Sequence, residues 1–113
     1  MELYDYERAA GATAVYNGRG EQAGLIYAAM ALGGEVGELQ NLAKKILRGD
    51  FKDHASASAN NVNMAGELGD VLWYVAAVAF ELGYSLDEIA AMNLGKLASR
   101  KQHGTLKGGR RLT

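Results

Sequence analysis

The sequence predicts an all-α protein, and three observations support this class. The chain contains no proline, so no residue breaks a helix from within by removing a backbone donor. Alanine, which has the highest helix propensity, is abundant. Apolar residues recur at spacings of three and four along most long segments, which is the period of an amphipathic helix. The length of 113 residues fits a single domain, residues 1–113.

A turn separates the first two predicted helices. We expect the first helix over residues 3–16, because its apolar residues fall on one stripe. The stripe consists of Leu3, Tyr6, Ala10 and Ala14. The sequence "NGRG", residues 17–20, has the composition of a turn. The second helix is expected over residues 21–48 and ends at Gly49, since glycine after a basic last turn is a common helix stop.

Two further helices are predicted in the second half of the chain. Residues 49–61 are small and polar, which predicts a loop without a core of its own. The third helix is expected over residues 63–82, before Gly83. Ser85 and Glu88 form a capping box that opens a fourth helix, which runs to about Gln102. The glycine-rich, basic tail from about residue 103 is expected to be extended or flexible.

The second and third helices are apolar on more than one side, and this predicts association between subunits. The short neighbouring helices of one chain could not cover all of these surfaces, so we expect a helical bundle formed between subunits. Gly33, Gly34 and Gly37 in the second helix would let another backbone approach closely or leave room for an ion.

Composition excludes several classes of function. The net charge of −1 argues against binding to a nucleic-acid polymer or a membrane surface through bulk charge. The absence of cysteine excludes disulfides and thiolate metal sites. The polar segment after Met1 does not have the pattern of a signal peptide, and no apolar run reaches the ~18 residues of a membrane span. We therefore expect a cytoplasmic protein with no membrane contact.

Two carboxylate pairs are the main candidates for chemistry. Glu35 and Glu38 lie three residues apart on one helix, and Glu67 and Asp70 repeat this spacing on the next. Antiparallel packing of the two helices would bring the four carboxylates together. Their mutual repulsion would favour a hard cation, Mg²⁺ or Mn²⁺. Solvated helix faces are the alternative interpretation, and spacing alone favours neither.

A di-iron site is excluded by the histidines. Such a bundle needs a Glu-x-x-His motif. The chain has His54 and His103, and neither follows a glutamate by three residues.

Basic and aromatic residues could complete a nucleotide site. Lys45 points within about 20° of the direction of Glu38 on an ideal helix. Asn93, Lys96 and Arg100 share one stripe of the fourth helix, where they form either a solvated face or a polyphosphate site.

Two aromatic residues follow Asp70 closely. Tyr74 faces the same way as Asp70, so it either stacks on a base or belongs to the core. Trp73 is expected in the core.

Three segments together resemble the MazG-like, all-α nucleoside triphosphate pyrophosphohydrolases. They are "GGEVGELQNLAKKILRGD", "ELGDVLWYVAAVAFELGYSLDEIAAMN" and "NLGKLASRKQHGTLKG". Their order and spacing match the family from about Leu25 to Gly108. The resemblance implies a Mg²⁺-dependent hydrolase acting on phosphoric anhydrides, which converts a nucleoside triphosphate to the monophosphate and pyrophosphate. It also implies a homodimer or a dimer of dimers, with sites near the subunit interface.

The resemblance assigns roles to individual residues. Glu35, Glu38, Glu67 and Asp70 match the metal ligands. Lys96 and Arg100 match phosphate-binding positions, Asn93 matches a substrate-contacting one, and Lys45 falls in the basic segment of the second helix. Among the carboxylates, Glu38 is our candidate for the residue that accepts the proton of the attacking water.

Relatives of this type include dimeric dUTPases, dCTP pyrophosphatases and a phosphoribosyl-ATP pyrophosphohydrolase, so the preferred base stays open. The tail "KGGRRLT" lacks the aspartate found in a related Gly-x-Gly-Asp-x-Arg ending. A non-catalytic helical module that binds a nucleotide or a protein is the alternative function.

Overall fold

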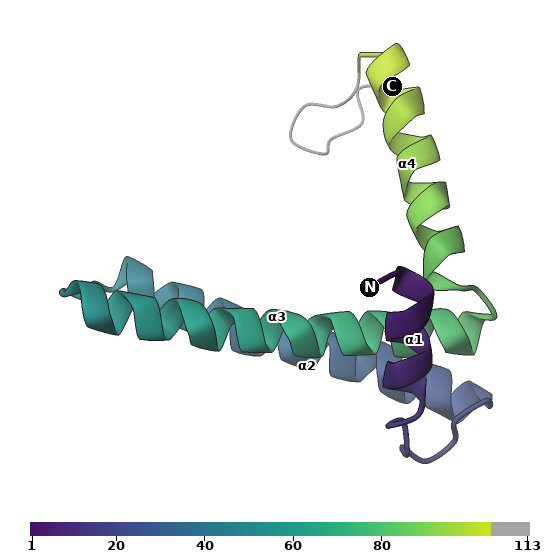
Figure 1. The fold of residues 1–113 in the computed structure, drawn as a ribbon, viewed down its shortest axis with the longest axis horizontal. Helices are drawn as coiled ribbons and strands as arrows, with labels where there is room; N and C mark the ends of the chain where they lie inside the picture. Colours follow the sequence, from purple (N-terminus) through teal and green to yellow (C-terminus); the bar gives the residue numbers. More distant parts are fainter. Residues whose placement is uncertain (105–113) are drawn as a thin grey trace.

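The computed structural model describes residues 1–104, which form four α-helices and no strands. These are α1 (Leu3–Gly11), α2 (Gln22–Leu47), α3 (His54–Leu82) and α4 (Leu86–Gln102). The long helices α2 and α3 lie side by side as an antiparallel hairpin, and α1 lies across the C-terminal half of α3 (Figure 1). The all-α class is therefore confirmed. The predicted tail lies, from residue 105 on, outside the described residues.

Helix α4 leaves the end of the hairpin and extends away from it (Figure 1). It contacts α1 and α3 but not α2. Its first turn is fastened to α1, because the backbone N–H of Leu86 donates a hydrogen bond to Glu7 Oε1 at 2.9 Å. The predicted capping box is present: Ser85 Oγ accepts from the N–H of Glu88, and Glu88 accepts from the N–H of Ser85. These contacts fix the direction in which α4 starts.

The predicted bounds of the second and fourth helices are confirmed to within one residue. Gly49 and Gly83 follow α2 and α3 with φ angles of 80° and 82°, a left-handed conformation that favours glycine. Both glycine stops are therefore confirmed.

Helix α1 ends at Gly11, so the prediction that it continues to Tyr16 was wrong. Thr13 turns back on the last turn of the helix: its N–H and its hydroxyl both donate to the carbonyl oxygen of Ala10, at 3.0 and 2.7 Å. A threonine hydroxyl that bonds to the backbone in this way competes with continued helix. Residues 12–21 then form a non-helical segment, which we call the 12–21 segment.

Helix α3 begins at His54, so the predicted loop over residues 49–61 is mostly helical. The cause is an N-cap that the sequence reading missed, since Asp53 Oδ1 accepts from the N–H of Ser56 at 2.7 Å. Asn60 lies in this added stretch and is only 2% exposed. Its side-chain amide donates to the sulfur of Met64. The remaining connection between α2 and α3 is short, which enforces the antiparallel hairpin.

A single subunit buries little of its apolar surface. Within residues 1–104 no large side chain is fully buried, and the buried apolar residues are Ala10, Ala28, Ala77, Ala79 and Leu86. Exposed apolar side chains include Met30, Leu47, Val62, Leu68 and Leu94. The radius of gyration is 17.1 Å, whereas a globular domain of this length has about 13 Å. No helix among the described residues combines the length and hydropathy needed to cross a membrane.

Replacing Gly24 by alanine is expected to lower the melting temperature, because the 12–21 segment crosses α2 at this residue. A Cβ atom on Gly24 would lie 2.2 Å from the carbonyl oxygen of Gly18, so the backbone would have to shift. Overpacking of this kind costs about 1–3 kcal/mol. Gly95→Ala on α4 is the matched control, since no described atom lies within 4 Å of its added Cβ. Thermal melts in which Gly24→Ala is as stable as Gly95→Ala would contradict the close crossing.

Candidate metal and nucleotide site

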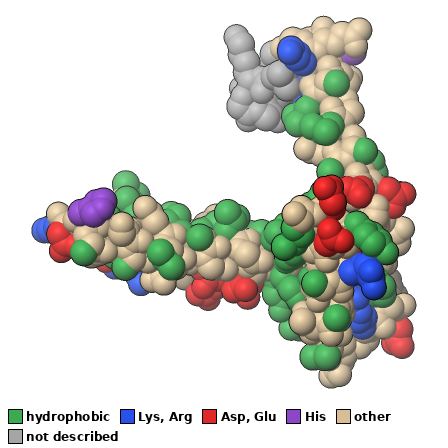
Figure 2. Space-filling model, in the orientation of Figure 1, with side chains coloured by type: hydrophobic (Ala, Val, Ile, Leu, Met, Phe, Trp, Pro, Cys, Tyr) green, Lys and Arg blue, Asp and Glu red, His purple; other side chains and the backbone are tan. Residues whose placement is uncertain are grey.

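Three carboxylates meet between the two long helices. Glu35 of α2 and Glu67 and Asp70 of α3 each place one oxygen within 4.8 Å of the other two. We call this group the carboxylate cluster. Figure 2 shows acidic side chains gathered midway along the α2–α3 hairpin. The helices bring the residues together because the three-residue spacing keeps Glu67 and Asp70 on one face, and the antiparallel hairpin sets that face beside Glu35.

The electrostatics of the cluster favour a cation. Burial raises the pKa of Glu35, as do its hydrogen bond with the carboxyl group of Glu67 and the charges of Asp70, Glu67 and Glu38. Two carboxyl groups can share a hydrogen bond only when one of them holds a proton, so the ionised forms of Glu35 and Glu67 repel each other. Glu67 Oε2 is buried and has no hydrogen-bond partner among the described residues. A buried acceptor without a partner is costly. The all-oxygen donor set and this unpaired oxygen therefore fit a hard divalent cation.

Glu38 lies outside the carboxylate cluster. It occupies the next turn of α2 after Glu35 and is exposed. Its charge nevertheless acts on the cluster, since it contributes to the raised pKa of Glu35. The structure thus brings together three of the four predicted metal ligands and places the fourth beside them.

Tyr74 and Tyr6 lie near the carboxylates, and Tyr27 adjoins Tyr74. A hydrogen bond with Tyr27, burial, and the charges of Glu35 and Asp70 raise the pKa of Tyr74 to about 12. Burial and the charge of Asp70 also raise the pKa of Tyr6 on α1. Sequence reasoning selected Tyr74 and missed Tyr27 as a site residue. Tyr6 had one signal, its place on the apolar stripe of the first helix, but nothing in the sequence connected it to Asp70.

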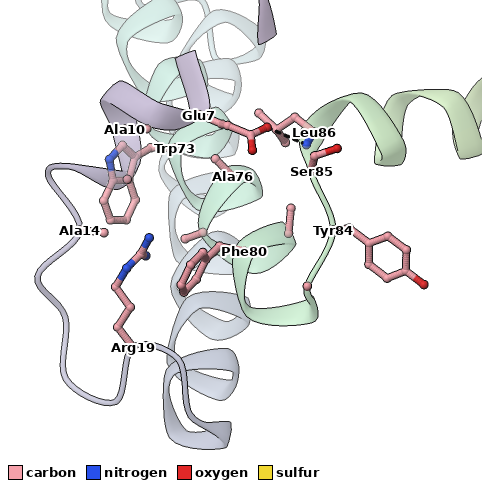
Figure 3. A pocket seen from close by; sticks show the side chains of 14 residues that line it. Glu7, Ala10, Ala14, Arg19, Trp73, Ala76, Phe80, Tyr84, Ser85 and Leu86 are labelled. Atoms are coloured by element: carbon pink, nitrogen blue, oxygen red, sulfur yellow. Dashed lines mark hydrogen bonds between the residues drawn. The ribbon is translucent and has the colours of Figure 1, made fainter. Parts of the chain in front are cut away.

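Trp73 is half-buried and lies beside a cavity of about 340 Å³ between α1, the 12–21 segment and the end of α3 (Figure 3). Its indole N–H donates to Thr13 Oγ1 at 2.9 Å. Its ring makes an edge contact with Tyr74, with centroids 4.9 Å apart. The expectation that Trp73 belongs to the core is met only in part, because one side of its ring faces the cavity.

The predicted basic residues lie away from the carboxylate cluster, near the end of α2 and on α4. Lys45 is half-buried in the last turn of α2. The pKa of the nearby Asp50 is lowered by its hydrogen bond with Arg48 and, less strongly, by the charges of Arg48 and Lys45. Asn93 and Lys96 are exposed on α4, and Arg100 is half-buried there. Because α4 extends away from the hairpin (Figure 1), one chain does not bring this stripe to its own carboxylate cluster.

The glycines near the carboxylates lie in open space. An added Cβ atom would have no described atom within 4 Å at Gly33, Gly34, Gly37, Gly66 or Gly69. The helix faces that carry these glycines are therefore free to receive an ion, a ligand or another backbone.

The fold and the site define a helical protein with a carboxylate cluster between two antiparallel helices. The family model for the MazG nucleotide pyrophosphohydrolase domain matches residues 28–105, and the chain belongs to this family. The match includes both carboxylate pairs. The chain is also 44% identical over 111 residues to the "Gene 37 protein" of Mycobacterium phage L5, an alignment that covers 96% of each chain. That name specifies no activity. No solved structure matches the chain significantly.

Proposed function

We propose that this protein is a Mg²⁺-dependent nucleoside triphosphate pyrophosphohydrolase that releases the monophosphate and pyrophosphate in the cytoplasm. The observation that carries the proposal is the carboxylate cluster, with its unpaired Glu67 oxygen, inside a domain of this family. Such a cluster suits an ion that binds phosphate oxygens. Mn²⁺ has similar ligand preferences and could replace Mg²⁺.

The acidic residues in and beside the cluster would have two roles, cation binding and proton transfer. Glu35, Glu67 and Asp70 would hold the cation, with Glu38 as a further ligand or as the base. When bound, Mg²⁺ neutralises phosphate oxygens and favours in-line attack by water on the α-phosphorus. Glu38 is the candidate for the base, because it borders the cluster without belonging to it and is open to water.

Substrate contacts would come from two sides of the cluster. Tyr74, which adjoins Glu35 and Asp70, would contact the nucleoside. Lys45, Lys96 and Arg100 would bind the polyphosphate and Asn93 the substrate. Since α4 extends away from its own hairpin, a second subunit would have to supply the α4 residues.

We expect a homodimer or a dimer of dimers in solution. One subunit exposes apolar residues along both long helices and on α4, and burying them between copies would be strongly favourable. Light scattering at micromolar concentration is expected to give at least twice the mass of one chain. A folded monomer under these conditions would contradict the expectation.

Product analysis tests the activity directly. The protein is incubated with each NTP and dNTP, and with phosphoribosyl-ATP, in Mg²⁺ and in EDTA, and the products are separated. We expect a monophosphate and pyrophosphate in Mg²⁺ only. Diphosphate with orthophosphate would indicate another hydrolase. No turnover with any substrate would favour the non-catalytic binding module. The same set of reactions identifies the preferred base.

A further inference from the structure

We propose that Glu81, near the end of α3, is a positioning residue that fastens the 12–21 segment and thereby holds a tyrosine cluster in place beside the carboxylate cluster. The tyrosine cluster consists of Tyr16, Tyr27 and Tyr74. This inference rests on the proposed function, because it assigns the tyrosine cluster to the nucleoside end of the same site.

The carboxylate of Glu81 binds the 12–21 segment at two points. Tyr16 Oη donates to Glu81 Oε2 at 2.6 Å. The backbone N–H of Gly20 donates to both oxygens, at 3.1 and 3.2 Å. Tyr16 Oη in turn accepts a hydrogen bond from Arg19 Nη1 at 3.1 Å. Hydrogen bonds to an ionised acceptor are the stronger kind, so Glu81 is the main polar anchor of the segment.

Two further contacts of the segment involve side chains. Trp73 donates to Thr13, and the guanidinium of Arg19 lies 3.8 Å from the centroid of the Phe80 ring. Figure 3 shows Arg19, Phe80 and Trp73 around the cavity that the segment helps to enclose. Because the segment is not part of a helix, its position depends on these contacts and on its close crossing of α2 at Gly24.

The anchored segment connects to the carboxylate cluster through aromatic rings. Tyr16 stacks on Tyr27, with ring centroids 5.4 Å apart. Tyr27 makes an edge contact with Tyr74, with ring centroids 6.4 Å apart. Tyr74 lies close enough to Glu35 and Asp70 for their charges to raise its pKa. A nucleotide whose phosphates lie at the cluster would therefore meet these rings with its nucleoside.

Glu81 itself is separate from the cation ligands. It is not one of the residues of the carboxylate cluster. Removing its carboxylate should therefore loosen the wall at the nucleoside end and leave the cation ligands in place. The expected result is weaker substrate binding with unchanged Mg²⁺ binding, which a general loss of structure would not produce.

The test compares four variants in steady-state hydrolysis with Mg²⁺. Glu81→Ala removes both anchors, and Tyr16→Phe removes one hydroxyl but keeps the ring. Glu81→Gln can still accept from Gly20 and is the conservative variant. Glu21→Ala removes an exposed carboxylate at the N-cap of α2 that makes no capping hydrogen bond, and serves as the control.

We expect KM to rise about tenfold for Glu81→Ala, with kcat within about twofold, because ordering the loosened segment would draw on the free energy of substrate binding. Tyr16→Phe and Glu81→Gln should each raise KM by less, the first because one hydroxyl is lost and the second because the charge and one acceptor oxygen are lost. Glu21→Ala should resemble the parent. The response of the melting temperature to Mg²⁺ should be unchanged in all four variants.

Trp73 gives a readout independent of turnover, because it is the single tryptophan of the chain and is bonded to the 12–21 segment. Its emission should move to longer wavelength and become easier to quench in Glu81→Ala but not in Glu21→Ala. If the parent is active and both Glu81→Ala and Tyr16→Phe keep the parental KM and the parental emission, this inference is overturned and the proposed function is not. If Glu81→Ala does not fold, Tyr16→Phe decides by the same measurements. An inactive parent would overturn the proposed function and this inference with it.

Discussion

Asp70→Asn is expected to abolish most of the Mg²⁺-dependent turnover while leaving the metal-free protein as stable as the parent or more stable. In the absence of metal, the three oxygens that lie within 4.8 Å of one another repel when ionised, and removing one charge relieves part of this repulsion. The same change weakens cation binding, because a neutral amide is a poorer ligand for a hard dication than a carboxylate.

The measurement is a set of thermal melts in EDTA and in Mg²⁺, combined with turnover assays. Binding to the native state alone stabilises the parent by about 2.7 kcal/mol at a hundredfold excess of ligand over Kd. We expect the Mg²⁺-induced rise in melting temperature to be largely lost in Asp70→Asn. Glu21→Gln, which removes a charge outside the site, should keep the full rise.

A purely structural role for Asp70 predicts the opposite result. If Asp70 were part of a buried ion pair, its loss would cost about 3–5 kcal/mol without metal, and Mg²⁺ would matter little. Arg48 and Asp50 form an ion pair in the structure, far along the hairpin from Asp70. The metal site would be contradicted if Asp70→Asn melted at a much lower temperature than the parent in EDTA and if Mg²⁺ did not change the melting temperature of the parent.

The carboxylate cluster could be predicted because its geometry is local. The three-residue spacing fixes Glu67 and Asp70 on one face, and the short connection between α2 and α3 fixes the antiparallel arrangement that adds Glu35. The exact position of Glu38 could not be predicted, since one turn of helix and a flexible side chain decide whether it joins the group. The cluster therefore contains three of the four expected residues.

The start of α3 and the end of α1 were predicted wrongly because each is decided by a single side-chain hydrogen bond, which composition does not reveal. The stretch after Asp53 is rich in alanine, serine and asparagine, which occur in loops and in helices alike. The aspartate that accepts from the N–H of Ser56 decides the outcome. In the first helix, the apolar stripe continues to Ala14, but the helix ends where Thr13 bonds to Ala10.

Contacts between distant residues were beyond prediction from the sequence. Tyr16 and Glu81 are separated by 65 positions, and Trp73 and Thr13 by 60. No pattern of spacing within one helix connects such pairs. The direction of α4 also depends on a distant contact, the hydrogen bond from Leu86 to Glu7. The positions on α4 were predicted from the resemblance, but their separation from the carboxylates of the same chain emerged only from the fold.

Mixing two inactive variants is expected to restore activity if each site combines the carboxylates of one subunit with the α4 residues of another. Asp70→Asn and Lys96→Ala should each lose most turnover alone, the first through the cation and the second through the polyphosphate. When the two chains are co-expressed, random pairing makes half of the dimers mixed, and each mixed dimer has one intact site. We therefore expect about a quarter of the parental activity.

The matched control co-expresses the parent with a chain that carries both substitutions. If sites form between subunits, each mixed dimer has one site without Asp70 and one without Lys96, so only parental dimers act and about a quarter of the activity remains. If each chain builds its own site, this mixture retains about half of the activity, and the two single variants do not rescue each other. That second pattern would require α4 to fold back onto its own hairpin. It extends away from the hairpin in the structure, held at its first turn by Glu7 and by the capping box of Ser85 and Glu88. The structure therefore favours rescue between subunits.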